Sequence, residues 1–551
     1  MKWLFAATLL GAILAAVETG GANTRPQFRN VAMLSRFSYR TRNGYPGHKY
    51  FVGSMCGGVA AFDYDGDGNI DLFFTNGSPL PELRKTDPSY FNALLRNRGD
   101  GTFDEVTRKA GLEGAKLSYS FGIAVGDYDN DGHPDLFLAS AGRDVLYHNN
   151  GDGTFSDVTA MSGIDTKPRD IISVAAVWFD YDNDGLLDLA VSEYTTWTPE
   201  SDIRCFASDG ITEVYCSPTR YRSTPNRLYH NLGHGKFEDV TENSGFGKSA
   251  GKGMGIVAAD FNGDGLMDVF IANDTERNFL YLNRGHGKFE EVGLLYGVAY
   301  NENGSTVSGM GADTADYDND GWPDIFYNDL DAQTFALFHN ERGRLFSYVS
   351  PRTGIERLSR SFSGWSTHFI DYDNDGWPDI YSANGDVDYL GANAKQHDTM
   401  WHNDAGRSFS DVSDRMGPDF LPIGFHRGSA RADLNNDGAP DLVITGLNET
   451  PRILLNSGSN NHWITLDLTG TRSNRDAIGA RLKLVTNSGR TLSTQVGTSS
   501  GFMSSSDRRA HFGLGAEIGI REIQIRWPSG TEQIIRHPAC DRILHIREDA
   551  R

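Results

Sequence analysis

The chain has 551 residues, with 51 Lys and Arg against 73 Asp and Glu, which gives a formal net charge of −22. This balance argues against nucleic-acid binding, which needs clustered positive charge to neutralise phosphates, and it disfavours docking on anionic membranes. Hydrophobic residues make up 38% of the chain and aromatic residues 11%, enough to build large cores and to exclude wholesale disorder. The 63 glycines exceed the usual share of about 7%.

Residues 1–20 have the pattern of a secretory signal peptide. Lys2 supplies the positive charge, the residues after it are apolar as far as Ala16, and small residues follow. The apolar stretch is shorter than the roughly twenty residues that a membrane-spanning helix needs. We therefore expect an exported, soluble protein, extracellular or periplasmic, whose mature chain begins between Val17 and Asn23.

A repeated acidic nonapeptide, D-x-[DN]-x-D-G-x-x-D, is the main feature of the chain. Seven copies occur, with 53 to 80 residues between successive first aspartates, and seven matches in register are not a product of chance. Asp and Gly recur in every copy, so both compositional excesses have one source. The copies, numbered here as acidic loops 1 to 7, are residues 63–71, 127–135, 180–188, 260–268, 316–324, 371–379 and 433–441.

A second repeat alternates with the first, a Phe followed three residues later by Val. Its seven copies begin at Phe28, Phe103, Phe155, Phe237, Phe289, Phe346 and Phe409. Short β-type runs follow the acidic loops, so each unit corresponds to about four strands. Seven such units predict an all-β fold, a seven-bladed β-propeller, because radial repetition buries each blade against its neighbours. Separate sandwiches would need linkers, which we do not find. Which strand closes the ring stays open.

The acidic loops resemble the first half of an EF-hand loop. Side chains at positions 1, 3 and 5 converge, Gly at position 6 permits the turn, position 7 offers its carbonyl, and Asp at position 9 closes the shell. Asx-rich turns without metal are the alternative, but four converging carboxylates would repel one another. Ca²⁺ is the best match, because Mg²⁺ demands a tighter octahedron and no histidine or thiolate cluster favours zinc.

We therefore predict up to seven Ca²⁺ sites. Loops 4 and 7 should bind more weakly, because Asn262 and Asn435 replace an acid. The predicted ligands are Asp63, Asp65, Asp67, Asn69, Asp71, Asp127, Asp129, Asp131, His133, Asp135, Asp180, Asp182, Asp184, Leu186, Asp188, Asp260, Asn262, Asp264, Leu266, Asp268, Asp316, Asp318, Asp320, Trp322, Asp324, Asp371, Asp373, Asp375, Trp377, Asp379, Asp433, Asn435, Asp437, Ala439 and Asp441.

This pattern resembles the FG-GAP or VCBS repeat family, the calcium-loop propeller also used in integrin α-subunits. The resemblance covers roughly residues 28–456. In integrins only some blades carry the metal loop, whereas all seven do here. No integrin-like stalk or transmembrane segment follows, so the likeness is to the head module alone.

The longest interval between acidic loops contains Cys205 and Cys216, which we expect to form a local disulfide. Cys56 and Cys540 could form a long-range link between the ends of the chain or remain two separate buried thiols. Around the local disulfide lies a mixture of side chains typical of recognition surfaces. These are Trp197, Arg204, Phe206, Tyr215, Arg220 and Tyr221. A plain structural insertion is the equally weighted alternative.

After residue 456 the repeats stop. Residues 457–551 carry 13 Lys and Arg against 9 Asp and Glu, which is +4 and leaves −26 for the preceding part. Alternating runs such as WITLDL (463–468) and REIQIRW (521–527) predict a small β-sandwich. We expect a signal peptide at 1–20, the propeller at 21–456 and this β domain at 457–551.

Several motifs of the C-terminal part resemble the ASPIC/UnbV domain. They are SNRDAIGAR (473–481), GFMSSSD (501–507), HFGLG (511–515) and RWPSG (526–530). Signal peptide, FG-GAP propeller and ASPIC/UnbV domain together resemble the cartilage acidic protein 1 family. The chain ends without the EGF-like module of longer animal members. The resemblance implies an exported calcium-binding protein.

Two functions compete. The first is a binding or adhesion module that takes a protein or glycan ligand, without catalytic residues. The second is an enzyme with a pocket at the propeller channel, for which the candidates are Arg169, Asp170, Lys252, His368, His426 and Arg427. No nucleophile elbow, zinc signature or phosphate loop supports the enzyme, so we favour the binding module. A purely structural alternative is that the basic C-terminal part docks on the acidic propeller.

Overall fold

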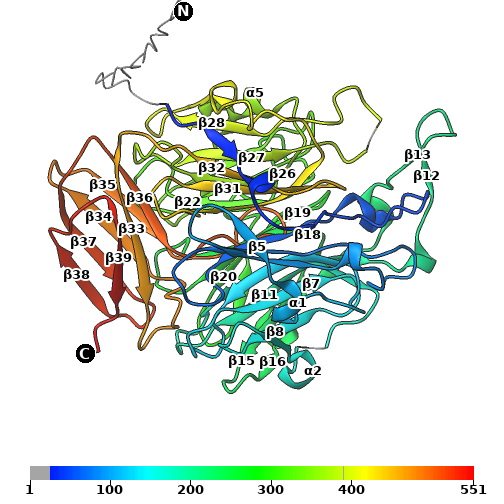
Figure 1. Cartoon of the computed structure of the whole chain (residues 1–551), viewed down its shortest axis with the longest axis horizontal. Coiled ribbons are helices and arrows are strands. Elements are labelled where there is room, and N and C mark those ends of the chain that lie inside the picture. Colours follow the sequence, from blue (N-terminus) through cyan, green and yellow to red (C-terminus); the bar gives the residue numbers. More distant parts are fainter. Residues whose placement is uncertain (1–24, 165, 389, 551) are drawn as a thin grey trace, which may run out of the picture.

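Seven four-stranded antiparallel sheets follow one another around a central axis in the computed structural model of the chain (Figure 1). The structure describes residues 25–164, 166–388 and 390–550, so the predicted signal peptide lies outside the described residues. The innermost strands contact one another in circular order, and the last returns to the first. The prediction of an all-β, seven-bladed propeller is confirmed.

Each blade places an acidic loop between its first and second strands. Blade 1 consists of β2 (Val59–Phe62), β3 (Asp71–Phe74), β4 (Ala93–Asn97) and β5 (Phe103–Glu105). Blade 2 consists of β6 (Ser120–Gly126), β7 (Asp135–Ser140), β8 (Val145–Asn149) and β9 (Phe155–Asp157). Blade 3 consists of β10 (Ile171–Phe179), β11 (Asp188–Thr196), β15 (Arg227–Asn231) and β16 (Phe237–Asp239). Blade 4 consists of β18 (Gly253–Ala259), β19 (Asp268–Asn273), β20 (Phe279–Asn283) and β21 (Phe289–Glu291). Blade 5 consists of β22 (Ala312–Ala315), β23 (Asp324–Tyr327), β24 (Ala336–Asn340) and β25 (Phe346–Tyr348). Blade 6 consists of β26 (Gly364–Ile370), β27 (Asp379–Asn384), β28 (Thr399–Asn403) and β29 (Phe409–Asp411).

The seventh blade closes the ring with the first strand of the chain. It consists of β30 (His426–Ala432), β31 (Asp441–Gly446), β32 (Arg452–Asn456) and β1 (Phe28–Asn30). Strand β1 pairs antiparallel with β32, with Phe28 opposite Asn456. The Phe repeat therefore begins before the first acidic loop because its first copy belongs to the last blade.

Short helical turns follow several outer strands. They are α1 (Thr107–Ala110), α2 (Thr159–Ser162), α3 (Thr241–Ser244), α4 (Ser350–Thr353) and α5 (Ile355–Ser359). Among the described residues, no helix is long and apolar enough to cross a membrane.

A ring of buried asparagines ties neighbouring blades together. In blade 5, Asn340 ends β24; its Nδ2 donates to the carbonyl of Phe261 in the preceding blade at 2.9 Å, and its backbone N–H donates to Asp324 at 2.7 Å. The same pair of bonds recurs in all seven blades. The asparagines are Asn97, Asn149, Asn231, Asn283, Asn340, Asn403 and Asn456.

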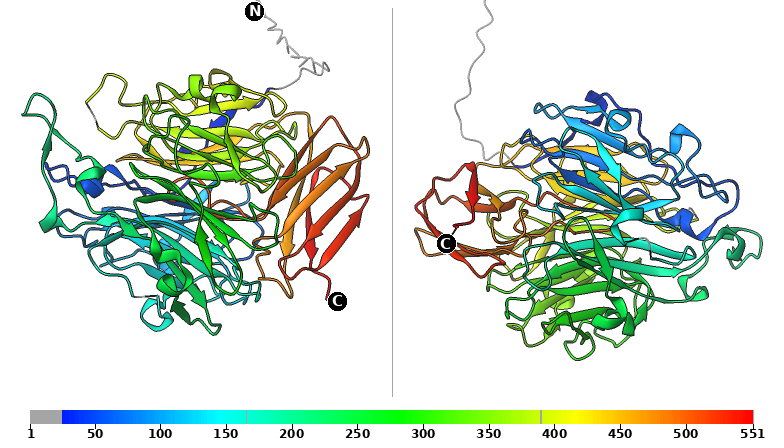
Figure 2. Two further views of the ribbon diagram at one scale, coloured as in Figure 1. Left: turned by 180° about the vertical axis from the view of Figure 1, so that it is seen from behind. Right: turned by 90° about the horizontal axis from the view of Figure 1, so that it is seen from below.

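The long interval in blade 3 forms an insertion that projects from the propeller. It carries the hairpin β12 (Cys205–Phe206) and β13 (Glu213–Val214), and the short pair β14 (Thr224–Pro225) and β17 (Ala250–Gly251) lies at its base. The predicted disulfide between Cys205 and Cys216 is present. The hairpin and the C-terminal sheets lie at opposite ends of the molecule in all three ribbon views (Figures 1 and 2).

The C-terminal part is a two-sheet sandwich. One sheet has the order β36 (Ala510–Gly515), β33 (His462–Thr469), β39 (Arg542–Arg547), in which β33 and β39 are parallel. The other has the order β35 (Thr491–Gln495), β34 (Arg481–Thr486), β37 (Ile520–Arg526), β38 (Glu532–Arg536). A shared apolar core fills the space between them, so the predicted small β-sandwich is confirmed.

Residues 498–507, called here the axial segment, leave this sandwich and enter the propeller axis. Phe502 and Met503 are fully buried in an apolar cluster with residues from several blades. The segment hydrogen-bonds to the innermost strand of every blade. The propeller partners are Val59, Ala61, Ile123, Val125, Ala176, Ile256, Ala312, Ser366 and Arg431.

Candidate metal centres

Each acidic loop is curled by hydrogen bonds between its own carboxylates and backbone. In loop 5, Asp316 accepts the N–H of Asp320 at 2.9 Å, and Asp320 accepts the N–H of Trp322 at 3.0 Å. Asp324, at position 9, accepts the N–H of Tyr317 at 3.1 Å and is fully buried. This local geometry brings the carboxylates of positions 1, 3, 5 and 9 to one side of the turn.

The carboxylate at position 3 carries the strongest sign of a cation site. In loops 1, 2 and 5 one oxygen of Asp65, Asp129 and Asp318 is buried without a hydrogen-bond partner among the described residues. In loop 1 ligand atoms of Asp63, Asp65 and Asp71 lie within 4.8 Å of one another. Buried acceptors without donors are costly, and a bound hard cation would satisfy them. The carboxylate oxygens gathered at positions 1, 3, 5 and 9 therefore fit Ca²⁺, a hard cation that takes oxygen ligands.

The electrostatics of the loops point the same way. Burial raises the pKa of Asp316 to about 8, with a further contribution from the carboxylate of Asp324. Burial likewise raises the pKa of Asp180 to about 8 and that of Asp188 to about 7. Without a cation, several of these groups would hold a proton near neutral pH, because crowded buried carboxylates disfavour the charged form.

The seven loops also differ in a neighbouring residue that the sequence analysis did not predict, a histidine in four of them. His148, His230, His339 and His402 lie beside loops 2, 3, 5 and 6 and approach the carboxylates at positions 3 and 9. The argument against zinc rested on the lack of a histidine cluster in the sequence, and these four histidines reach the loops from the neighbouring strand of their own blade. Each of these histidines directly precedes an asparagine of the interblade ring, and this aromatic-His-Asn pattern is a signal that could have identified them.

The remaining three loops have other neighbours at the same position. In loop 1, Arg96 pairs with Asp65 at 2.7 Å and with Asp67 at 3.0 Å. In loops 4 and 7, where position 3 is Asn, the residue is Leu282 or Leu455. A basic residue therefore accompanies every loop with Asp at position 3, and an apolar residue accompanies both loops with Asn there. The hydrogen bond to Asp324 raises the pKa of His339 to about 9, so the basic residue offsets part of the loop charge.

The C-terminal sandwich docks on the acidic loops. Arg481 pairs with Asp260 of loop 4 at 3.0 Å, and Asp476 accepts the N–H of Asp127 of loop 2 at 2.7 Å. His511 contacts Asn374 of loop 6 at 2.6 Å. In loop 7, Trp463 lies so close to Gly438 that a Cβ there would be 1.8 Å from the indole. The structure thus supports the docking alternative, although the contacts are specific rather than a diffuse attraction of opposite charges.

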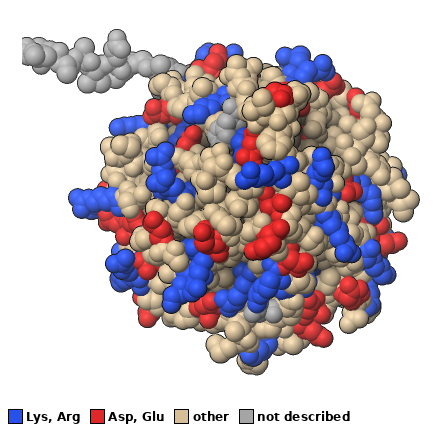
Figure 3. Space-filling view, turned by 90° about the vertical axis from the view of Figure 1, so that its right-hand side faces the viewer, with Lys and Arg blue, Asp and Glu red and all other residues tan. Residues whose placement is uncertain are grey.

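The proposed recognition surface around the disulfide is only partly exposed. Trp197, Tyr215 and Tyr221 are buried, and the Trp197 indole donates to Asp202 at 2.6 Å. Arg204, Phe206 and Arg220 are exposed. On this side of the molecule basic and acidic side chains lie interspersed (Figure 3). The insertion therefore combines structural packing with a small exposed tip.

The residues considered for an enzyme do not form one site. His368 is fully buried and contacts Ser429 and, at 3.2 Å, Ser500 of the axial segment. The other two central candidates are equally enclosed: His426 contacts Asp398 at 2.6 Å, and Arg427 lies over the Trp365 ring at 3.8 Å.

The other three enzyme candidates lie apart from these. Lys252 is buried and pairs with Glu276 at 2.9 Å, while Arg169 and Asp170 lie on the exposed turn before β10. The channel pocket on which the enzyme alternative depends is filled by the axial segment.

The two remaining cysteines are separate. Cys56 is buried in the core around the axial segment, and Cys540 is a partly exposed thiol beside Asp541 in the C-terminal sandwich. The open question of a long-range link between them is thereby answered.

The fold and its loops define a class of protein, the repeat propellers with acidic loops, and comparison of the sequence with known families agrees. The FG-GAP-like repeat family matches residues 63–138, 127–191, 206–271, 260–327 and 316–382, together more than half of the chain. The chain therefore belongs to the FG-GAP-like repeat family. The family described as ASPIC and UnbV matches residues 470–551.

Among named proteins, the chain is similar to cartilage acidic protein 1. The human protein is 24% identical over 506 residues, which is 89% of this chain and 62% of the human protein. The Xenopus tropicalis protein is 22% identical over 479 residues, 86% of this chain and 61% of its own length. The chain thus spans about three fifths of the length of these relatives. Integrin alpha-4 of Xenopus laevis is 29% identical over 156 residues, 24% of this chain and 14% of the integrin.

Solved structures resemble the chain only distantly. An Agrocybe aegerita lectin that recognises non-reducing terminal N-acetylglucosamine has a TM-score of 0.41 at 15% identity, covering 72% of this chain and 86% of the lectin. YCF48 bound to a D1 peptide has a TM-score of 0.39 at 8% identity, covering 73% and 91%. At these scores the alignments say nothing about the ligand of this chain.

Proposed function

We propose that this chain is an exported, calcium-stabilised propeller that serves as a binding or adhesion module. The observation that carries the metal is the set of buried position-3 carboxylate oxygens without a partner, seen at Asp65, Asp129 and Asp318. Bound Ca²⁺ would supply positive charge and accept these oxygens as ligands. The ligands in each loop are the side chains at positions 1, 3, 5 and 9 and the carbonyl at position 7.

The loops should not bind equally. Loops 2, 3, 5 and 6 offer four carboxylates each beside a histidine, which can give up its proton when a cation binds, whereas an arginine stays charged. Loop 1 holds the Arg96 guanidinium among its carboxylates, and loop 4 holds that of Arg481 against Asp260. These guanidinium groups compete with a cation for the same oxygens. We therefore place the strongest sites in loops 2, 3, 5 and 6.

Three features support export. They are the signal-like residues 1–20, the Cys205–Cys216 disulfide, which persists in oxidising compartments, and the similarity to cartilage acidic protein 1. The propeller would occupy residues 21–456 and the ASPIC/UnbV-like domain residues 457–551. A rigid scaffold with a filled axis favours binding on its outer surfaces, to a protein or a glycan.

Removal of calcium tests the metal assignment. A ligand that binds only the native state stabilises it by mass action, so excess EGTA should lower the melting temperature and expose the chain to protease. Added Ca²⁺ should restore both, and Mg²⁺ at the same concentration should not. Calorimetric titration should show at least four tight sites. Unchanged melting and protease resistance in EGTA would refute the calcium proposal.

A further inference from the structure

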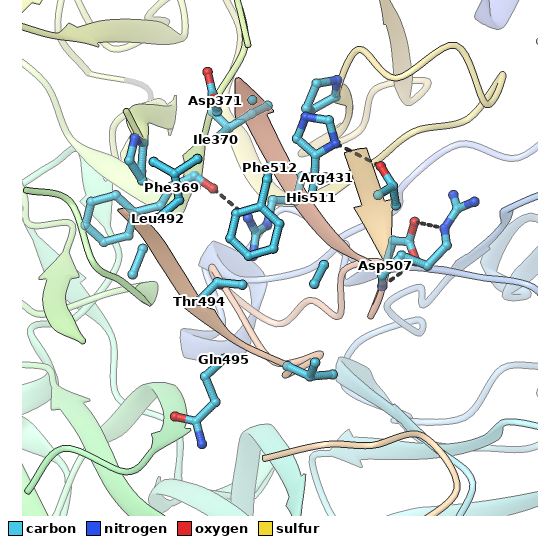
Figure 4. A pocket seen from close by; sticks show the side chains of 18 of the residues that line it. Phe369, Ile370, Asp371, Arg431, Leu492, Thr494, Gln495, Asp507, His511 and Phe512 are labelled. Carbon is cyan, nitrogen blue, oxygen red and sulfur yellow. Dashed lines mark hydrogen bonds and ion pairs between the residues drawn. The ribbon is translucent and has the colours of Figure 1, made fainter. Parts of the chain in front are cut away.

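A cleft of about 620 Å³ separates the C-terminal sandwich from acidic loop 5. Its volume lies within the range of about 300–1,000 Å³ found for small-molecule sites. One wall is loop 5, including Asn319, Asp320 and Trp322, and the other is the outer face of the sheet β35-β34-β37-β38. Its inner end continues into a smaller cavity of about 130 Å³, which Arg431 and Gln495 also line (Figure 4).

The sheet wall carries three cations in adjacent positions. Arg481 and Arg526 lie directly opposite each other on β34 and β37, and Lys483 is two residues further along β34. Like charges in such positions destabilise a sheet unless something compensates them. Asp260 compensates Arg481 at 3.0 Å. Within the described parts of the chain, Lys483 and Arg526 make neither an ion pair nor a side-chain hydrogen bond.

Neutral polar side chains flank these cations. Lys483 lies between Ser493 of β35 and Gln524 of β37, and Gln495 lies opposite Arg481. Hydroxyl and amide groups both donate and accept hydrogen bonds, so they suit a ligand rich in hydroxyl groups. At the inner end, Arg431 donates from Nη1 to the Phe369 carbonyl at 2.8 Å, while its buried Nε lacks a partner.

The acidic side chains of the cleft lie mostly on the propeller wall. Asp313 is buried and accepts the N–H groups of Phe369 and Thr314, both at 2.8 Å, so its charge is already engaged. Asp316 and Asp320 belong to loop 5, where a bound cation would hold them. Glu532 is the acid on the sheet wall and lies directly opposite Arg526 on β38. The sheet wall thus carries three cations and this one lining acid, and an anionic group of a ligand would face it.

Trp322 gives the propeller wall an apolar surface. Its indole rests against Gly263 and Gly343, where a Cβ would come within 2.8 and 2.9 Å of the ring. The glycines therefore leave room for the ring, whose position beside the polar groups of the cleft suits stacking on the apolar face of a sugar. Aromatic rings combined with a few placed polar groups are the usual composition of a ligand site.

We propose that this cleft binds an acidic saccharide, a short hydroxyl-rich chain whose carboxylate or sulfate groups are held by Lys483 and Arg526. The inference rests on the proposed binding function and specifies its ligand class. Trp322 stacks on a sugar ring, and Ser493 and Gln524 hydrogen-bond to hydroxyl groups, while Gln495 is held by the N–H of Asp260 and the carbonyl of Gly479. Arg431 closes the inner end with its free N–H.

Calorimetric titration of the full chain in Ca²⁺ tests the proposal with three tetrasaccharide probes. They are tetragalacturonate, its uncharged methyl ester, and a sulfated galactan tetramer. The test variant is Lys483→Gln with Arg526→Gln. The control is Arg521→Gln with Arg536→Gln, which removes the same charge from β37 and β38 outside the cleft. Melting curves of both variants check that they fold.

At least one acidic probe should bind, and the test variant should weaken that binding at least 10-fold, while the control stays within about 2-fold. The methyl ester should not bind measurably. Whichever acidic probe binds then shows whether the ligand is a uronate or a sulfated saccharide. Equal binding of charged and uncharged probes, equal losses in both variants, or no binding of either acidic probe would overturn the proposal.

Failure of this inference and failure of the binding function have different signatures. A protein or glycan screen with and without calcium that yields a partner insensitive to Lys483→Gln and Arg526→Gln leaves the binding function standing and removes the cleft. A screen that yields no partner in either condition counts against the binding function itself.

Discussion

Gly438 of loop 7 offers a direct test of how the C-terminal sandwich docks on the propeller. It lies at position 6 with a φ of +83°, and a Cβ there would be 1.8 Å from the Trp463 indole. Gly68 occupies the same position in loop 1 with a φ of +86°, and a Cβ there would meet nothing within 4 Å. The two glycines therefore differ in their neighbour and not in their backbone.

Substitution by alanine should separate the two effects. Both Gly438→Ala and Gly68→Ala place a Cβ in the left-handed region, at a cost of about 1–2 kcal/mol each. Gly438→Ala also drives the Trp463 ring away from loop 7, and overpacking of this kind costs about 1–3 kcal/mol more. The expected difference in unfolding free energy between the two variants is therefore about 1–3 kcal/mol.

Urea denaturation in Ca²⁺, followed by tryptophan fluorescence, measures the difference. Limited proteolysis should also cut the connection near residues 457–461 faster in Gly438→Ala than in Gly68→Ala, because the sandwich is held less firmly. Equal stability and equal proteolysis of the two variants would show that the contact between Trp463 and loop 7 does not hold the sandwich in place.

Three further predictions concern the axis, the blade contacts and pH. Phe502→Ala should lower the free energy of unfolding by about 3–5 kcal/mol, because Phe502 is fully buried and its ring centre lies 5.2 Å from that of Trp365. The control is Phe206→Ala, at an exposed position, and both are measured by urea denaturation. A loss of stability no larger than the control's would contradict a packed axis. Asn340→Ala should lower the free energy of unfolding by about 1–3 kcal/mol, because the buried Phe261 carbonyl loses its hydrogen-bond donor. Asn303→Ala, at an exposed position, is the control and should leave the free energy of unfolding unchanged in the same assay. In EGTA the melting temperature should fall as pH rises from 6 through about 9. Burial raises the pKa of Asp316 to about 8, and the hydrogen bond to Asp324 raises the pKa of His339 to about 9. Both groups therefore stabilise the metal-free fold while they are protonated. That stabilisation is lost as the pH rises through their pKa values. A melting temperature in EGTA that rises over this range would contradict the crowding of carboxylates in the loops.

The propeller could be predicted because its signals are local. The curl of each acidic loop depends on residues within nine positions of one another, as the bonds of Asp316 to the N–H of Asp320 show. Seven copies of such a motif, with seven copies of the Phe repeat, state the number of blades. The strand character of the C-terminal part is likewise visible from alternating runs.

The neighbours of the loops could not be predicted, because they come from distant parts of the chain. His339 approaches Asp318 and Asp324 only because β24 lies beside β23, and Arg481 reaches Asp260 across 221 positions of sequence. The expectation of up to seven sites, weaker in loops 4 and 7, treated each loop alone. In the structure the loops differ in the residue that lies beside them, which is a histidine, an arginine or a leucine.

The sequence by itself determined the repeat, the blade number, the position of the acidic loops and the local disulfide, because each depends on contacts between residues close along the chain. Only the tertiary structure decided that β1 closes the seventh blade, that the GFMSSSD motif at 501–507 fills the axis, and that a cleft lined by Lys483 and Arg526 opens beside loop 5. These features depend on which surfaces of remote segments pack together, and that choice is made by the free energy of the whole fold rather than by any local pattern.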